Sequence, residues 1–305
     1  MRAMVTGGAG FIGSHLVEAL VNQGAKVSLL DNLVFGQLNR IHPQAVFHNV
    51  DIRSKKAKKL IEQEKPDVFF HLAAQTDVQQ SILDPGYDGD VNILGTINLL
   101  EACREAHVGK VIFASTSAVY GNLQKMSLSE SDPTAPISYY GLSKCTAESY
   151  FRLFHRLYGI PYTILRFSNV YGPGQTAKGE GGVVAVFCDR IQADRPITVH
   201  GDGEQTRDFI YVKDVVGALL AAVKRGDQET IQVSSSSKTS VNDLAATLSR
   251  IHGSPIDIVH TPSRKGDIKH SCLNNGKARH DLHWQPLVGL LEGLTETYNH
   301  SKKTE

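Results

Sequence analysis

Short apolar runs and amphipathic stretches alternate along the first 170 residues. Six runs bounded by Gly, Asp or Pro have the length of strands buried on both faces, and they cover residues 3–5, 27–30, 46–50, 68–72, 111–114 and 163–167. Apolar side chains recur at helical spacing between them, over residues 11–22, 55–64, 91–107 and 139–158. Strands that alternate with helices predict an α/β fold with a parallel sheet and right-handed crossovers.

Three glycines, Gly7, Gly10 and Gly13, lie between the first expected strand and the first expected helix. In such a turn the first glycine permits a tight bend, the second lets the backbone approach a pyrophosphate, and the third lets helix and strand pack closely. The N–H groups at the helix N-terminus then attract phosphate. The segment predicts a Rossmann, doubly wound sheet that binds a dinucleotide, with Phe11 and Ile12 among its contacts.

Asp31 ends the second expected strand. A carboxylate at this position accepts hydrogen bonds from the adenosine ribose and repels a 2′-phosphate, so NAD is favoured over NADP. A turn or helix-cap aspartate is the alternative. Asp51, after the third strand, could reach the adenine or cap a turn. The predicted NAD site also includes Asn32 and Ile52.

Tyr140 and Lys144 are separated by one helical turn near the start of an expected helix. Lowering a tyrosine pKa from about 10 to about 7 requires about 4 kcal/mol. One positive charge at about 4 Å supplies about that much when the effective dielectric constant is about 20. The pair can therefore provide a phenolate base at neutral pH, although an isolated match is more often an exposed helix pair.

Residues 111–121 predict a fifth strand that runs into hydroxyl side chains at its carboxyl end. Ligands of open parallel sheets bind at that end. Thr116 or Ser117 can donate a hydrogen bond to a sugar oxygen there. The alternative is that these hydroxyl groups cap a turn.

With these features in this order, the chain resembles the extended short-chain dehydrogenase/reductases, specifically the NAD-dependent nucleotide-sugar epimerases and dehydratases. The similarity runs nearly end to end and includes residues 71–75, 90–96, 166–173, 201–209 and 264–267. It implies that Thr116, Tyr140 and Lys144 are catalytic. It also implies that NAD, besides its other contacts, touches Tyr140, Lys144, Leu72, Ala73, Ala74, Gln75 and Asn92.

The same resemblance implies a UDP-sugar substrate. Ser117 would assist catalysis and Asn169 would lie near the sugar diphosphate. Arg207 and Arg264 would bind the phosphates, as planar guanidinium groups do well, and Asp267 the uridine ribose. The resemblance also implies a homodimer in which the helices around residues 91–107 and 140–158 pair as a four-helix bundle.

Two positions refine the expected reaction. Dehydratases and decarboxylases of the group carry acidic residues after the catalytic threonine, whereas Ser117 and Ala118 follow here, so the chain is most similar to the UDP-glucose 4-epimerases. Related enzymes that exclude N-acetylated sugars carry a bulky residue seven positions after the arginine that corresponds to Arg264. Ser271 is small, and we expect UDP-GlcNAc and UDP-GalNAc to fit besides UDP-glucose and UDP-galactose. The alternatives are a 4-epimerase of UDP-glucuronate or another nucleotide sugar, and a noncatalytic NAD-binding regulator.

Composition and organisation set further expectations. The formal net charge of +1 provides no field that would gather nucleic acid or coat an anionic membrane. The chain begins without the segments of a signal peptide and contains no apolar run of about 18 residues, and its four cysteines are far apart, so we expect a cytoplasmic protein. Scattered histidines predict no metal site. We expect a cofactor domain over residues 1–172 and a smaller nucleotide-sugar lobe over residues 173–305, with some crossing of the chain between them.

Overall fold

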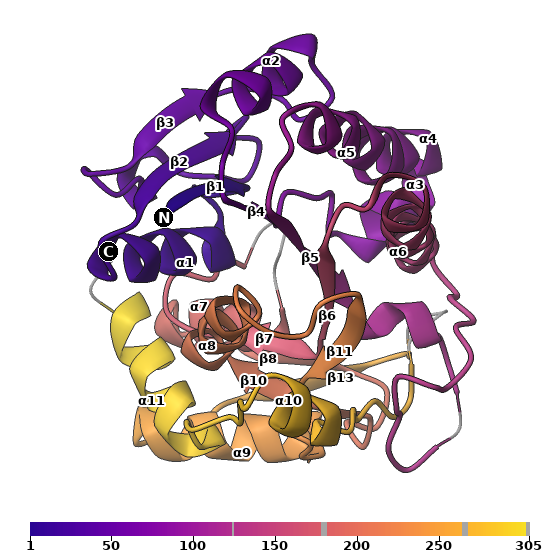
Figure 1. The fold of residues 1–305 in the computed structure, drawn as a ribbon. Coiled ribbons are helices and arrows are strands. Elements are labelled where there is room, and N and C mark those ends of the chain that lie inside the picture. Colours follow the sequence, from indigo (N-terminus) through magenta and orange to yellow (C-terminus); the bar gives the residue numbers. More distant parts are fainter. Residues whose placement is uncertain (124, 178–181, 264–267, 303–305) are drawn as a thin grey trace.

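The computed structural model describes residues 1–123, 125–177, 182–263 and 268–302. Its centre is a seven-stranded parallel sheet in the order β11-β6-β5-β4-β1-β2-β3 (Figure 1). The strands are β1 (Arg2–Thr6), β2 (Lys26–Asp31), β3 (Val46–Asn49), β4 (Val68–His71), β5 (Lys110–Thr116), β6 (Tyr162–Phe167) and β11 (Glu229–Val233). The strand order reverses between β1 and β4, as the predicted doubly wound fold requires.

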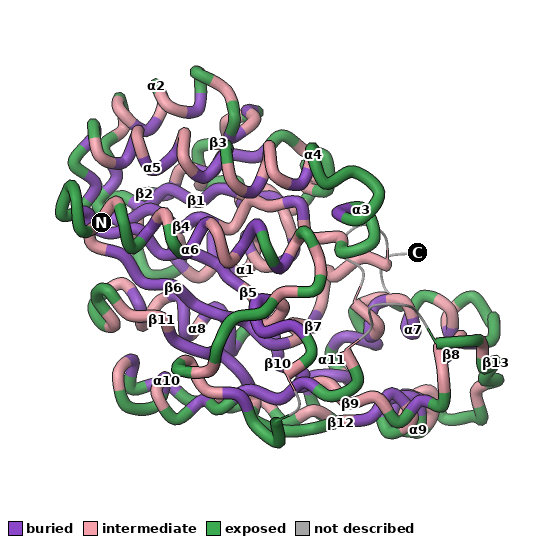
Figure 2. Tube along the Cα trace, turned by 90° about the vertical axis from the view of Figure 1, so that its right-hand side faces the viewer, coloured by how far each residue is buried: buried purple, intermediate pink, exposed green. Residues whose placement is uncertain are grey.

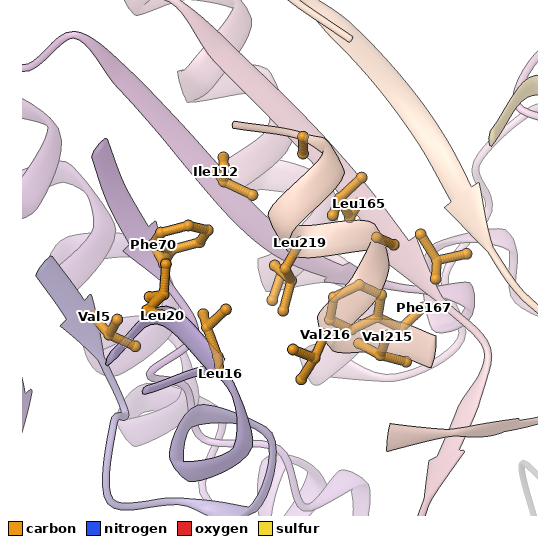
Figure 3. Packing of buried hydrophobic residues seen from close by; sticks show 14 of the residues in the cluster. Val5, Leu16, Leu20, Phe70, Ile112, Leu165, Phe167, Val215, Val216 and Leu219 are labelled. Carbon is orange, nitrogen blue, oxygen red and sulfur yellow. The ribbon is translucent and has the colours of Figure 1, made fainter. Parts of the chain in front are cut away.

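Helices cover both faces of this sheet, and Figure 2 shows the strands buried between them. On one face lie α1 (Phe11–Asn22), α8 (Val212–Ala221) and α10 (Gly276–Asp281). On the other lie α2 (Lys55–Glu64), α5 (Gly95–Glu105) and α6 (Tyr139–Tyr158). Figure 3 shows Leu16 and Leu20 of α1 and Leu219 of α8 beside Phe70 and Ile112 of the sheet. Among the described residues, no helix is both long and apolar enough to span a membrane.

The single helix that was predicted over residues 91–107 is divided into two elements in the structure, and two further short helices precede it. The structure has two short helices, α3 (Val78–Leu83) and α4 (Pro85–Gly89), and then a π-helical turn, η2 (Asp90–Leu94), that leads into α5. Asp84 starts α4 by accepting a hydrogen bond from the Tyr87 N–H at 2.9 Å. Pro85 then occupies the first turn, where its missing N–H costs nothing.

A smaller lobe packs below the sheet around its own apolar cluster. Its helices are α7 (Val183–Gln192), α9 (Val241–His252) and α11 (Leu290–Ser301). Its strands form three pairs, which are β7 (Asn169–Tyr171) with β10 (Phe209–Tyr211), β8 (Ile197–His200) with β13 (Ile258–Thr261), and β9 (Thr206–Arg207) with β12 (Thr239–Ser240). The boundary at residues 172 and 173 stays a prediction, but β11 and α8 lie beyond it and still belong to the central sheet layer.

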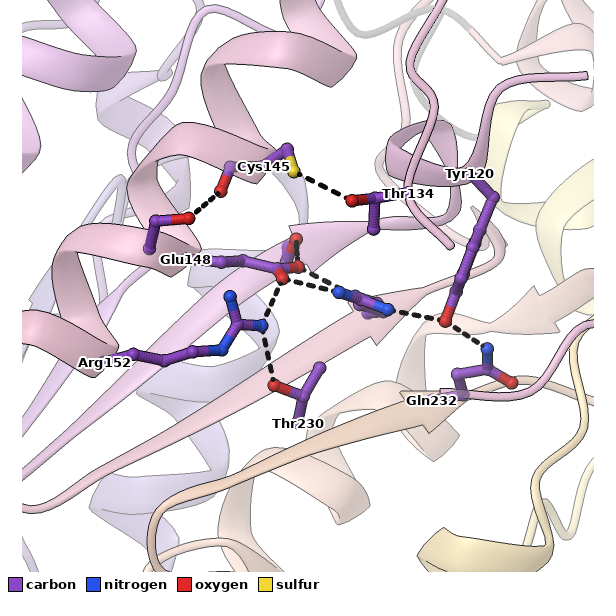
Figure 4. Close-up of polar contacts among 10 residues, drawn as sticks. Tyr120, Thr134, Cys145, Glu148, Arg152, Thr230 and Gln232 are labelled. Atoms are coloured by element: carbon purple, nitrogen blue, oxygen red, sulfur yellow. Dashed lines mark hydrogen bonds and ion pairs between the residues drawn. The ribbon is translucent and has the colours of Figure 1, made fainter. Parts of the chain in front are cut away.

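A buried polar network ties α6 to the sheet (Figure 4). Glu148 is fully buried, and its carboxylate accepts hydrogen bonds from Arg166 Nε at 2.8 Å and Arg166 Nη2 at 2.6 Å. It also accepts one from Ser115 Oγ at 2.7 Å and one from Arg152 at 2.8 Å. Arg166 donates in turn to the hydroxyl of Tyr120 at 2.7 Å. Because both charges are hydrogen-bonded, their burial is tolerated.

We expect Glu148→Ala to destabilise the protein strongly, because it leaves Arg166 buried without its carboxylate. Breaking a buried pair in this way costs about 3–5 kcal/mol, measured as the free energy of unfolding in urea. The matched control is Arg152→Ala, which removes the half-exposed partner of the same carboxylate and should cost about 1 kcal/mol or less. Equal losses in the two variants would contradict this account of the network.

Candidate active site

A cavity of about 290 Å³ lies at the carboxyl ends of the strands, over the point where the strand order reverses. Its lining includes most of the residues predicted to bind NAD, namely Gly7, Gly10, Phe11, Ile12, Gly13, Asp31, Asn32, Asp51, Ile52, Leu72, Ala73, Ala74, Gln75, Tyr140 and Lys144. The structure therefore brings together residues that lie far apart in the sequence.

The glycine turn is packed so closely that two of its positions have no room for a side chain. Gly7 has a φ of +69°, and a Cβ atom on it would lie 2.9 Å from the Ala73 nitrogen. A Cβ on Gly13 would lie 2.0 Å from the Gly7 oxygen, so α1 packs against the turn only because a hydrogen is there. No side chain caps the N-terminus of α1 at Gly10. These N–H groups fit the pyrophosphate of a dinucleotide.

Asp31 is buried at the carboxyl end of β2. Its carboxylate accepts hydrogen bonds from the N–H groups of Ala9 at 3.0 Å and Leu33 at 2.8 Å. Burial raises the pKa of Asp31, and these two N–H groups oppose that effect. Hydroxyl donors of a ribose would stabilise the carboxylate further, whereas a phosphate would repel it.

Asp51 also lines the cavity and is already paired. Its carboxylate accepts hydrogen bonds from Arg53 Nε at 2.9 Å and from Asn32 Nδ2 at 2.9 Å. The Arg53 guanidinium holds the pKa of Asp51 well below its usual range. A negative charge thus remains on this wall, where an adenine amino group can donate to it.

Asn92 is the one predicted NAD residue that does not line the cavity. It is buried behind the wall, in η2, where its Oδ1 accepts from the Gln75 N–H at 2.9 Å and its Nδ2 donates to the Gln75 carbonyl at 2.9 Å. Asn92 therefore positions Gln75. Its direct contact with NAD stays a prediction.

Tyr140 and Lys144 reach the cavity from the first turns of α6. Ser138 starts this helix by accepting a hydrogen bond from the Gly141 N–H at 3.1 Å. Lys144 is only 3% exposed; its Nζ donates to the Ala114 carbonyl at 2.9 Å and lies 4.7 Å from the centre of the Phe113 ring. Burial lowers the pKa of Lys144 to about 8. An ammonium held in so dry a place acts strongly on a neighbouring phenol.

Thr116 ends β5, and the expected strand over residues 111–121 stops there. Its Oγ1 accepts a hydrogen bond from the Ala118 N–H at 3.1 Å, which starts the 3₁₀ turn η3 (Ser117–Tyr120). The predicted turn cap is thus present, and it leaves the hydroxyl proton of Thr116 to donate elsewhere. Ala114 and Ser115 line the cavity, and Thr116 and Ser117 follow them directly in the chain.

The predicted substrate residues fall into two groups. Asn169 lines the cavity at the start of β7. Arg207 and Ser271 do not line it, but they meet at Thr206, whose carbonyl accepts hydrogen bonds from Arg207 Nη1 at 2.9 Å and from the Ser271 N–H at 3.2 Å. Arg264 and Asp267 lie outside the described residues.

The sequence of this chain also matches the model of a protein family. It is described as the NAD dependent epimerase/dehydratase family and matches residues 3–234, which is more than half of the chain. The chain belongs to this family.

Members of the NAD dependent epimerase/dehydratase family match nearly the whole chain. A UDP-glucose 4-epimerase of Mycolicibacterium smegmatis is 39% identical over 97% of both chains. The solved UDP-glucose 4-epimerase of Thermotoga maritima with UDP-glucose is 41% identical, with a TM-score of 0.98, over 100% of this chain and 99% of that one. The UDP-glucose 4-epimerase of Thermus thermophilus in complex with NAD is 36% identical, with a TM-score of 0.96, over 100% of both. The predicted family, fold class and NAD cofactor are confirmed.

Among the lining residues that the sequence did not single out, three have buried oxygens without a partner. Thr76 Oγ1, Ser168 Oγ and Gln175 Oε1 are buried and have no hydrogen-bond partner among the described residues. Buried polar atoms are seldom left unpaired, so these three oxygens suit contacts to a ligand. Thr76 directly follows the 71–75 segment, so extending that motif by one residue would have found it, and Ser168 lies within the 166–173 segment but was not singled out there.

We expect Asp31→Asn to weaken NAD binding by about 10-fold or more, since a hydrogen bond to a charged group contributes about 1.5–3 kcal/mol. Isothermal titration of protein freed of nucleotide measures the affinity. Asp67→Asn is the control. Asp67 directly precedes β4, so it lies at the amino ends of the strands, away from the cavity, and it pairs with the exposed Arg2. Unchanged affinity in Asp31→Asn would contradict the assignment of Asp31 to the ribose.

Proposed function

We propose that this chain is an NAD-dependent UDP-hexose 4-epimerase that interconverts UDP-glucose and UDP-galactose. The observation that carries the proposal is the buried ammonium of Lys144, one helical turn from Tyr140 in the wall of the NAD cavity. The Thermotoga maritima relative, whose structure contains UDP-glucose, supports the same substrate. We also propose that the cavity-lining residues predicted above to bind NAD contact this cofactor.

Tyr140 is the proposed base. It takes the proton of the sugar 4-hydroxyl because the charge of Lys144 stabilises its phenolate. The hydroxyl of Thr116 donates to the same sugar oxygen and holds it in place, with Ser117 assisting. Bound NAD supplies a reversible acceptor for the hydride of C4, so a 4-keto sugar forms. Return of hydride to the other face and of the proton from Tyr140 gives the epimer and regenerates NAD.

The residues after Thr116 favour epimerisation over elimination or decarboxylation. Both of those reactions need a further acid or base close to the sugar. Ser117 and Ala118 offer no carboxylate, and the Ala118 N–H is engaged by Thr116 Oγ1. The proposed mechanism thus uses one titrating base, Tyr140, which suits a reaction that returns the proton to the oxygen it left.

The substrate contacts are proposed from the family resemblance. Asn169 contacts the sugar diphosphate, Arg207 and Arg264 bind its phosphates, and Asp267 binds the uridine ribose, as the family resemblance implies. Ser271 is small and almost fully buried. A small side chain at this position leaves room for a 2-N-acetyl group, so the proposed substrates include UDP-GlcNAc and UDP-GalNAc.

We also propose that the protein forms a homodimer and that it is located in the cytoplasm. Helices α3, α5 and α6 lie side by side (Figure 1). α3 carries the exposed side chain of Ile82, and α6 carries those of Leu142, Leu153 and Leu157. Leucines at positions 142, 153 and 157 lie close to one face of a helix, and a second copy of the chain would cover them. The four cysteine side chains are free thiols, which supports a reducing compartment.

The substrate assay separates the candidate functions. Purified protein is incubated with UDP-galactose, UDP-GalNAc and UDP-galacturonate separately, without added NAD, and the products are resolved by chromatography. We expect the first two to be converted to their 4-epimers by retained NAD. Conversion of UDP-galacturonate alone would replace the UDP-hexose assignment with a UDP-glucuronate epimerase. NAD binding without any conversion would favour a regulator.

Tyr140→Phe tests the assigned base. The variant should lose turnover while it still binds NAD, because the ring is kept and only the titrating hydroxyl is removed. Tyr139→Phe is the matched control: Tyr139 precedes it in α6, and its side chain is half exposed, so turnover should stay close to that of the unmodified protein. Full activity in Tyr140→Phe would refute the mechanism.

The dimer is tested by sedimentation. Leu153→Glu places a charge on the exposed face of α6 and should convert dimer to monomer, since an unpaired charge at an interface core is costly. Leu287→Glu changes another strongly exposed leucine outside α3, α5 and α6 and should leave the dimer intact. A monomer at all concentrations of unmodified protein would overturn the proposed assembly.

A further inference from the structure

Asp88 lies behind the cavity wall, in α4, and is 1% exposed. Its Oδ1 accepts hydrogen bonds from Gln75 Nε2 at 3.0 Å and from Asn92 Nδ2 at 3.1 Å. Its Oδ2 has no hydrogen-bond partner among the described residues. A buried carboxylate with an unsatisfied oxygen is unstable unless a positive charge lies close to it.

Lys144 provides that charge. Burial raises the pKa of Asp88, while the Gln75 amide, the charge of Lys144 and the Asn92 amide lower it. Reciprocally, the charge of Asp88 raises the pKa of Lys144 against the effect of burial. Among the described residues no hydrogen bond or ion pair joins the two side chains directly, so their charges act on each other through the buried protein between them.

The other charged and titratable groups around Lys144 do not replace Asp88. Glu148 also raises the pKa of Lys144, but its two oxygens are occupied by Arg166, Arg152 and Ser115 (Figure 4). His71 faces Lys144 from β4 and is neutral, because burial lowers its pKa to about 3. From β5, the Phe113 ring and the Ala114 carbonyl carry no net charge.

The π-helical turn η2 makes this arrangement possible. Asn92 is buried within this turn, and its two N–H groups are shared among Asp88 Oδ1, the Gln75 carbonyl and Ser143 Oγ, the last at 3.2 Å. Ser143 in turn donates to the Tyr140 carbonyl at 3.0 Å. Hydrogen bonds thus connect Asp88 both to the cavity wall and to the helix that carries Tyr140 and Lys144. π-Helical turns occur often at functional sites.

We propose that Asp88 is a positioning residue of the reaction, whose negative charge keeps Lys144 protonated inside the protein and so sets the pH range in which Tyr140 acts as base. This inference rests on the proposed epimerase function. Its sign follows from electrostatics. Removing one negative charge makes a proton easier to remove from both Lys144 and Tyr140. Neutral Lys144 also stabilises the phenolate less, so the maximal rate falls.

Asp88→Asn tests the proposal, because it removes the charge and keeps the shape. The pH profile of kcat with UDP-galactose should move to lower pH, its basic limb by about one unit or more, and its maximum should fall. Asp88→Glu restores the charge and should return both limbs towards their original pH. A lower maximum with both limbs in place would indicate a purely structural role and would overturn the inference.

A second measurement needs neither the Asp88→Asn variant nor an active protein. NMR of the unmodified protein, with its aspartate carboxyl carbons labelled, follows the Asp88 signal as pH rises. The signal should inflect near pH 8, where Lys144 loses its proton, and this inflection should vanish in Lys144→Met. No inflection would overturn the inference. Failure of the unmodified protein to convert any UDP-sugar would overturn the proposed function instead.

Discussion

The ammonium group of Lys144 is buried and donates a hydrogen bond to the carbonyl of Ala114. An ammonium in such a place tends to lose its charge, and much of the surrounding structure opposes that loss. The carbonyl belongs to the end of β5, the opposing carboxylates come from α4 and α6, and the aromatic ring of Phe113 lies close by. The reactivity assigned to Tyr140 thus depends on the packing of separate helices against one strand end.

The same strand end is also held by the Glu148 and Arg166 pair. Ser115, between Ala114 and Thr116, donates to Glu148, and Arg166 extends the network to Tyr120. Gln232 of β11 donates to the same Tyr120 hydroxyl at 2.5 Å. The strand that carries Thr116, whose hydroxyl is proposed to contact the substrate, therefore cannot shift without disturbing α6, β6 and β11.

Much of the cavity could be predicted from the sequence because its residues come from short motifs with local causes. The glycines, Asp31 and the Tyr140 pair each follow from a turn, a strand end or a helical repeat. The strand β11 was not predicted, since Glu229, Thr230 and Gln232 make it polar in sequence and only pairing with β6 buries it. The π-helical turn and the partnership of Asp88 with Lys144 depend on contacts between distant segments, which periodicity does not record.

The position of β11 also affects how the chain matures during synthesis. The strand lies far along the sequence, yet it closes one edge of the sheet by pairing with β6. Until it leaves the ribosome, β6 presents an unpaired edge, and the part of the sheet face that α10 covers stays open for longer still, because α10 follows β11 in the chain. A nascent chain that already contains the whole glycine turn and Tyr140 is therefore still unfinished and prone to aggregate, and chaperones would be needed most during this interval.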